Sequence, residues 1–255
     1  MLVVISILGV LAALTVPALK NLGKSDAHIG ASRQLLDGIG RARQLAMANR
    51  TTVYMVFVPT NFWVVSGSFP NAWWTSLTPA QQTAATNLCD KQLTGYTFVG
   101  RGTVGDQPGQ HAWNYLATWQ NLPDGTFIAW QKFYATNTIV DQISGAAYPI
   151  SEFSYTNSIP FPTENSTNGV YLPYIAFNYL GQLTLDGQNL AGRDEYIPLA
   201  QGSVSLAINT ATKALVFNSP SVLETPPGNS TNISYNIVHI DALTGRAVLE
   251  HHKVQ

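Results

Sequence analysis

Few residues in this sequence have the types and spacing that catalysis requires. His239 and Asp241 lie two positions apart in a predicted strand, so they share a face and could belong to a hydrolase triad, but no G-x-S-x-G nucleophile motif accompanies them. The segment GRGTVG at residues 100–105 has the spacing of a dinucleotide-binding loop, yet Pro108 and Gly109 follow where that loop needs a helix. The sequence therefore predicts no catalytic residue, no cofactor and no enzyme activity.

Metal ligands are equally sparse. The five histidines lack HExxH spacing, and His251 and His252, as neighbours in a strand, would point to opposite sides. The segment DGQNLAGRDE at residues 186–195 offers carboxylates, but not in the order of an EF-hand calcium loop, so we favour a solvated turn over a calcium site. The single cysteine, Cys89, is expected to be a small buried residue. No metal site is predicted.

Four Asn-x-Ser/Thr triplets occur in the chain. Three of them lie in loops rich in small polar residues, and the candidate glycosylation sites are therefore Asn165, Asn229 and Asn232.

The composition narrows the class of partner. Charged residues make up 11% of the 255 residues and the net charge is −1, so no basic surface for nucleic acid is expected. Glycine, proline, asparagine, threonine and aromatic residues are plentiful, which favours strands and turns. Most of the aromatic rings are expected to be in the core.

The first fifty residues differ from the rest. No charge occurs before Lys20, and residues 2–19 are apolar almost throughout. From Lys20 to Arg50 the pattern is helical, with apolar residues spaced by four, four, three and four at Ala31, Leu35, Ile39, Ala42 and Ala46. Fifty helical residues would span about 75 Å, far more than a membrane, so the second half is expected to leave the membrane and pack on a globular head.

Several segments resemble type IV pilins and type II secretion pseudopilins. LVVISILGVLAALTVPAL is similar to the N-terminal helix of that superfamily, with Gly9 and Pro17 at its helix-loosening positions. RQLLDGIGRARQLAMANRTTVYMVFVP, YIAFNYLGQL and VHIDALTGRAVLE resemble the helix-to-strand passage and two hairpins of the FimT-like, H-type minor pseudopilins. The family's leader, processing glycine, methylated phenylalanine and glutamate do not appear in the sequence, so the resemblance places processing and N-methylation on no residue here.

The resemblance implies a structural subunit of an extracellular filament or periplasmic pseudopilus. The subunit would be held in the inner membrane before assembly, and would then polymerise helically with copies of itself or with other pilins. The residues expected to make these subunit contacts are the apolar residues of the first helix together with its glycine and proline: Leu2, Val3, Val4, Ile5, Ile7, Leu8, Gly9, Val10, Leu11, Leu14, Val16, Pro17 and Leu19. The alternative is a membrane-anchored binding module whose β-sheet head recognises glycans or surfaces through exposed aromatic residues.

The predicted fold is α+β, with a long N-terminal helix at residues 1–50 packed on an antiparallel β-sheet head at residues 51–255. Leu35, Ile39, Ala42 and Ala46 are expected to form the contact between the two. A second helix is predicted at residues 78–93, after Thr78 and Pro79. Strands are predicted at residues 52–58, 62–66, 96–99, 126–133, 170–179, 203–208, 214–217, 233–240 and 246–251.

Overall fold

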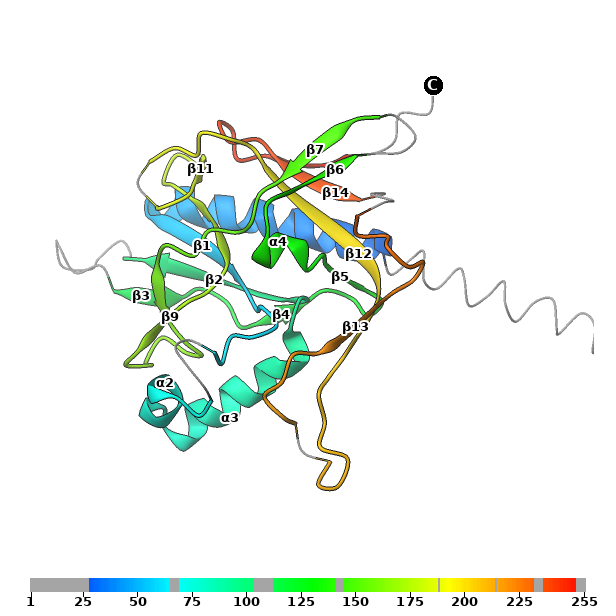
Figure 1. Ribbon diagram of the computed structural model, residues 1–255. Coiled ribbons are helices and arrows are strands. Elements are labelled where there is room, and N and C mark those ends of the chain that lie inside the picture. Colours follow the sequence, from blue (N-terminus) through cyan, green and yellow to red (C-terminus); the bar gives the residue numbers. More distant parts are fainter. Residues whose placement is uncertain are drawn as a thin grey trace, which may run out of the picture.

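The computed structural model describes residues 28–250, except 65–68, 103–111, 141–144, 188, 214 and 232–235. A long helix, residues 28–49, lies against two antiparallel β-sheets, and shorter helices complete the fold (Figure 1). This mixture of antiparallel sheets and a few helices agrees with the predicted α+β class.

The first sheet contains six strands. Its main path runs in the order β11 (Leu183–Thr184), β10 (Tyr174–Phe177), β1 (Thr52–Phe57), β2 (Gly95–Arg101) and β3 (Trp113–Tyr115), and β4 (Gln120–Asn121) also pairs with β2. The GRGTVG segment begins at the end of β2, and β2 pairs with both β1 and β3 in the antiparallel direction. This is not the parallel βαβ unit that a dinucleotide-binding loop requires.

The second sheet is organised around one long strand. β12 (Glu195–Ser205) pairs in succession with β14 (Ile237–Ile240), β5 (Thr126–Ile128) and β13 (Ser221–Glu224), and β15 (Ala247–Glu250) pairs with β14. Two small hairpins, β6 (Asn137–Val140) with β7 (Ala147–Ile150) and β8 (Ser158–Pro160) with β9 (Gly169–Tyr171), complete the strands.

The first sheet is buried on both faces, and β1 shows why. Val53, Met55 and Phe57 point into a core shared with the long helix and the second sheet. Tyr54 and Val56 alternate with them and point into a second, aromatic-rich core on the opposite face. A strand covered on both sides needs apolar residues at every position, which explains the sequence TVYMVF.

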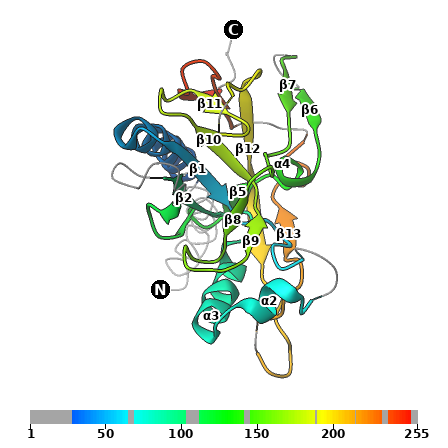
Figure 2. The ribbon, with the colours of Figure 1, turned by 90° about the vertical axis from the view of Figure 1, so that its left-hand side faces the viewer.

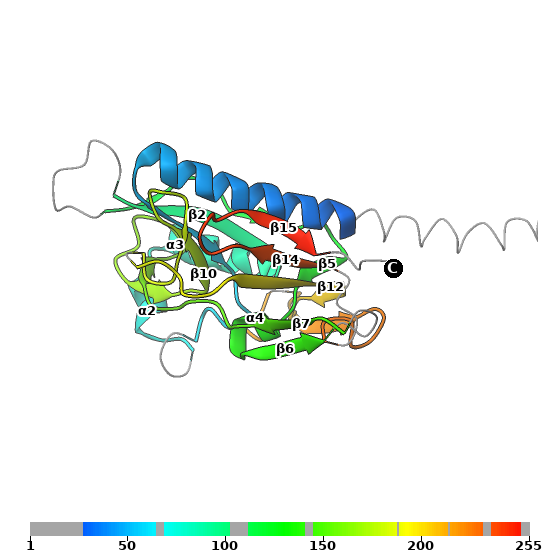
Figure 3. The ribbon, with the colours of Figure 1, turned by 90° about the horizontal axis from the view of Figure 1, so that it is seen from above.

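The long helix belongs to the core of the head. Leu35, Ile39, Ala42 and Ala46 are all 0% exposed and lie in the same cluster as residues of both sheets. Figure 3 shows the helix alongside β2 and β15. The apolar stripe predicted from the sequence, from Ala31 to Ala46, is therefore the face of the helix that packs on the sheets.

Truncating this stripe is expected to destabilise the head strongly. Leu35→Ala and Ile39→Ala each remove buried methyl groups from a packed site, and we expect a loss of about 2–5 kcal/mol per substitution. Thermal or denaturant unfolding of the full chain in detergent measures the effect. Ile29→Ala is the control, because Ile29 is 47% exposed on the same helix. Two core variants that unfold like the parent would contradict the packing.

His28 lies at the start of the described helix and makes stability depend on pH. It is 5% exposed, its Nδ1 lies 3.3 Å from Thr126 Oγ1, and burial lowers its pKa below the ordinary value of 6.5. The unfolded chain therefore binds a proton at pH values where the folded chain does not, so stability is lost as the pH falls below 6.5.

We expect His28→Gln to flatten this dependence. The free energy of unfolding of the parent should fall more steeply between about pH 7 and about pH 5 than that of the variant, as measured by denaturant titration. His239→Gln serves as the control that keeps His28. Parallel curves for the parent and His28→Gln would contradict the role of His28.

The opposite face of the first sheet is covered by short helices. α2 (Ala72–Ser76), α3 (Pro79–Asn87) and the 3-10 helix η1 (Leu88–Lys91) lie on the side of the sheet away from the long helix (Figure 2). Thr78 and Gln81 form a reciprocal capping box at the start of α3, as expected from the predicted cap. The α-helix ends at Asn87, earlier than predicted, and η1 carries the chain on to Lys91.

Several predicted strands are wrong. Of the strand predicted at residues 62–66, the described residues 62–64 form none, because Phe62 and Trp63 lie in a turn and their rings enter the aromatic core. Residues 126–133 are a strand only to Ile128 and then turn into α4 (Gln131–Tyr134). Of the strand predicted at residues 214–217, the described residues 215–217 contribute only an isolated bridge at Leu215.

Two other predicted strands have different limits. Residues 170–179 divide into β9 and β10, since Pro173 interrupts the run and its carbonyl accepts a hydrogen bond from the Phe57 N–H. The strand predicted at 203–208 begins much earlier, at Glu195. Strands β3, β4, β6, β7, β8, β11 and β13 were not predicted.

Candidate functional site

The long helix meets the β10–β11 turn and the β14–β15 turn at one junction. The Nε–H of Arg43 is shared between two carbonyl oxygens, that of Gly181 at 3.1 Å and that of Thr244 at 2.8 Å. Gly181 lies in the turn between β10 and β11, and Thr244 lies in the turn between β14 and β15. One side chain of the helix therefore ties together a turn from each sheet.

The turns approach each other so closely that a glycine is required. Gly245 has a φ of +63°, and a Cβ atom there would lie 2.0 Å from the carbonyl oxygen of Gly181. The sequence TGR at residues 244–246 thus provides the only residue type that suits both the backbone conformation and the close approach.

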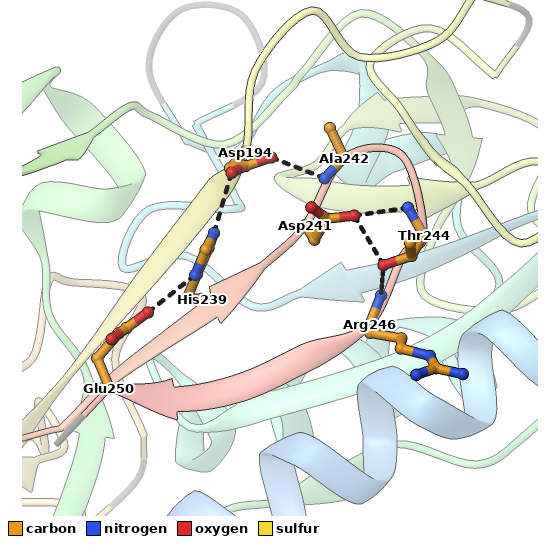
Figure 4. A network of polar contacts seen from close by, with 7 residues as sticks. All are labelled: Asp194, His239, Asp241, Ala242, Thr244, Arg246 and Glu250. Atoms are coloured by element: carbon orange, nitrogen blue, oxygen red, sulfur yellow. Dashed lines mark hydrogen bonds and ion pairs between the residues drawn. The ribbon is translucent and has the colours of Figure 1, made fainter.

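Asp241 closes the turn between β14 and β15. Its Oδ1 accepts hydrogen bonds from the N–H and the hydroxyl of Thr244, both at 2.7 Å, and these bonds lower the pKa of Asp241 (Figure 4). The N–H of Gly245 donates to the Asp241 carbonyl at 2.8 Å. Asp241 is therefore a turn residue, and it does not contact His239 as a triad acid would.

His239 lies between two other carboxylates. Its Nδ1 is 2.9 Å from Glu250 Oε1 and its Nε2 is 3.0 Å from Asp194 Oδ2 (Figure 4). The second oxygen of Asp194 accepts the N–H of Ala242 at 2.8 Å. The imidazole ring also stacks on Tyr196, with centroids 4.6 Å apart and planes at 14°.

The strand register explains this arrangement. His239 is on β14, between β12 and β15, and stands directly opposite Tyr196 on one side and Val248 on the other. Asp194 and Glu250 are each two residues from those partners, so they occupy diagonal positions on the same face. Sequence reasoning identified His239 but missed both carboxylates, which only the pairing register places beside it.

This geometry stabilises the hairpin but does not suit general-base catalysis. Both ring nitrogens of His239 already face a carboxylate, so activating a nucleophile would require breaking one of these contacts. Cys89, the only cysteine, is 4% exposed as expected, and burial, with a smaller effect from Asp90, raises its pKa to about 11, which keeps the thiol neutral.

The acidic segment at residues 186–195 does not converge on one point. Asp186 accepts hydrogen bonds from Asn189, Asp194 binds His239, and Glu195 binds Lys132. Within the described residues, no group of three or more histidine, cysteine, aspartate or glutamate side chains is placed to hold a metal ion. His251 and His252 lie outside the described residues.

Lys132 and Glu195 form a buried ion pair between α4 and β12. Lys132 is 0% exposed, and its Nζ donates to Glu195 Oε2 and, at 2.6 Å, to the carbonyl of Ser151. The same Nζ lies 4.8 Å from the ring centroid of Phe153. Burial lowers the pKa of Lys132, and the Glu195 carboxylate opposes that shift.

The candidate glycosylation sites differ in exposure. Asn165 is exposed in a turn, as a surface site requires. Asn229 is a correction to the prediction: it is 6% exposed, and its Nδ2 donates to the carbonyls of Gln201 and Pro226 at 2.7 and 2.8 Å. An amide held inside the fold in this way is not available for a sugar. Asn232 lies outside the described residues.

Most of the aromatic rings are in the core, as predicted. Of the six tryptophans, only Trp130 is exposed by more than a third. Tyr134, Tyr155 and Tyr171 line a hollow of about 240 Å³, but the hydroxyls of Tyr134 and Tyr155 already donate to Asn61 Oδ1 and to the Phe133 carbonyl. Both hydroxyls therefore already donate hydrogen bonds within the head.

The residues predicted to make subunit contacts, from Leu2 to Leu19, lie outside the described residues. Among the residues that the structure does describe, no helix combines the length and apolar character needed to cross a membrane. Comparison of the chain with protein-family models, with curated proteins and with solved structures finds no match.

Proposed function

We propose that this chain is a structural subunit of a type IV pilus-like or pseudopilus filament that polymerises helically through its N-terminal apolar segment. The observation that carries the proposal is the long helix. Its residues 31–46 bury one stripe in the head, and the sequence before it continues into an uncharged, apolar run from Leu2 to Leu19.

The head supplies its own cores. The described residues form one core with the long helix and a second, aromatic core on the far side of the first sheet. The run from Leu2 to Leu19 is thereby free to pack in an apolar environment outside the head. A membrane provides that environment before assembly, and the same segments of neighbouring subunits provide it in a filament.

The polar contacts of the head also favour a structural role over an enzymatic one. His239 is held by two carboxylates, Asp241 caps a turn, and Lys132 and Glu195 neutralise each other in the interior. Each of these ionisable side chains makes its contacts within the fold, between strands, within a turn or between α4 and β12. Copies of this chain, or other pilins, are the proposed partners, on the cell surface or in a periplasmic pseudopilus.

Electron microscopy of material sheared from producing cells tests the proposal. We expect thin filaments that an antibody against the head labels along their length for a main subunit, or at isolated points for a minor one. If the protein is expressed in the membrane and no labelled filament is found, the proposal fails. The membrane-anchored binding module then becomes the better account of the same sequence.

A further inference from the structure

A small cleft lies where the long helix ends and the first sheet begins. Its walls come from the end of the helix, the start of β1, the end of β2, the turn after β10 and the loop after β11. Its volume is about 270 Å³, and it contains two arginines, Arg50 and Arg101. We name it the Arg50–Arg101 cleft.

Arg101 has a buried donor that no acceptor among the described residues satisfies. Its Nε is shielded from solvent and has no hydrogen-bond partner in the part of the chain that the structure describes. The guanidinium carbon lies 5.5 Å from the ring centroid of Trp113, so the aromatic ring supports the side chain from one side. A buried N–H without an acceptor is costly, which makes an incoming anion a favourable partner.

Tyr54 supports Arg101 in the wall of the cleft. It is 1% exposed, burial raises its pKa to about 12, and its hydroxyl lies within hydrogen-bonding distance of the Arg101 side chain. A Cβ atom at Gly187 would lie 2.1 Å from this hydroxyl, so only glycine fits against it.

Arg50 occupies a backbone position that usually belongs to glycine. The N–H of Thr51 donates to the Ala46 carbonyl at 3.2 Å, and Arg50 has a φ of +49°. This is the left-handed position that ends a helix in a Schellman motif, where a side chain carries a steric cost. The arginine at this position brings a second guanidinium to the cleft.

The charge and shape of the cleft narrow the ligand class. Asp186 also lines the cleft, so two guanidinium groups and one carboxylate leave a net charge of +1, which matches a monoanion. Tyr179 is 59% exposed and offers a ring face at the rim, as sugar rings require for stacking. The volume is below the range of drug-sized sites, so one sugar unit fills it.

We propose that the Arg50–Arg101 cleft binds a carboxylate-bearing sugar unit of the uronic acid class. The two arginines bind the carboxylate, Tyr54 holds Arg101 in place, and the Tyr179 ring packs against the apolar face of the sugar. This inference goes beyond the filament role and does not depend on it, because the cleft is formed within one head.

Calorimetric titration of the full chain in detergent tests the ligand class. Galacturonate is the probe, with galactose as the neutral sugar of the same shape and acetate as the carboxylate without a sugar. We expect saturable binding of galacturonate at concentrations where galactose and acetate give no signal. Absence of galacturonate binding, or equal binding of either control, overturns the proposal.

Two substitutions test the cleft itself. Arg50→Gly introduces the residue that the helix end prefers, so the melting temperature should be kept or raised while the affinity for galacturonate falls about tenfold or more. Arg101→Met should lower affinity to a similar extent. Arg33→Gln is the charge-matched control, because Arg33 is exposed on the same helix, about 25 Å along its axis from Arg50. Unchanged affinity in folded Arg50→Gly overturns the assignment.

Discussion

Leu11→Asp is expected to abolish filament formation while the head remains folded. Leu11 lies in the uncharged run from Leu2 to Leu19, which we propose packs between subunits. A carboxylate there would be desolvated without a partner in every subunit, at a cost of about 3 kcal/mol or more per copy. Because a filament repeats the same contact along its length, a loss of this size in each subunit prevents assembly. Counting filaments in sheared material by electron microscopy measures the effect.

Leu11→Ile is the matched control for this experiment, since it keeps the volume and the apolar character of the side chain. It should give the filament yield of the parent. The circular dichroism melting curve of Leu11→Asp in detergent should also match the parent, because the head has cores of its own. A normal yield of filaments from folded Leu11→Asp would refute the assembly role.

Breaking the buried pair of Lys132 and Glu195 is expected to cause a large loss of head stability. In Glu195→Gln, the Lys132 ammonium stays in the interior and keeps the Ser151 carbonyl, but loses the carboxylate that neutralises it. Removing one partner of a buried ion pair typically costs about 3–5 kcal/mol. Denaturant unfolding monitored by tryptophan fluorescence gives the change.

Two further variants separate the pair from its surroundings. Lys132→Met combined with Glu195→Leu replaces both charges with apolar groups of similar size, and it should recover most of the lost stability. Arg193→Gln removes the other cation near Glu195. The Nε of Arg193 lies 3.7 Å from the Glu195 carboxylate, but the Arg193 side chain is 50% exposed, so this variant should change stability by less than about 1 kcal/mol. If Glu195→Gln is as mild as Arg193→Gln, the pair does not stabilise the fold.

The parts of the fold that sequence patterns predicted are the local ones. β1 has an uninterrupted apolar run, β2 has aromatic and β-branched residues in succession, and the β14–β15 hairpin has a Thr-Gly turn, so each carries its own signal. The stripe from Ala31 to Ala46 is likewise a periodic feature of a single helix.

The parts that could not be predicted depend on partners distant in the chain. The segment after Ile128 has apolar residues on both faces, which is typical of a covered strand, but Lys132 must turn inward to reach Glu195, 63 residues away. β12 begins at Glu195 because three different strands supply its neighbours in turn. No local pattern records either contact, and the same holds for the carboxylate of Asp194 beside His239, 45 residues apart.

The contact between the long helix and the head is also a mechanical joint. Its fully buried stripe runs from Ala31 to Ala46, about 22 Å along the axis, and Arg43 anchors it to both hairpin turns near the far end. Tension applied to the helix from its N-terminal side acts parallel to this contact, so all the buried side chains resist the displacement at the same time. A force across the helix axis would instead separate them from the sheets one turn at a time. A head joined in this way resists load best along the helix axis, which is the direction of tension in the proposed filament.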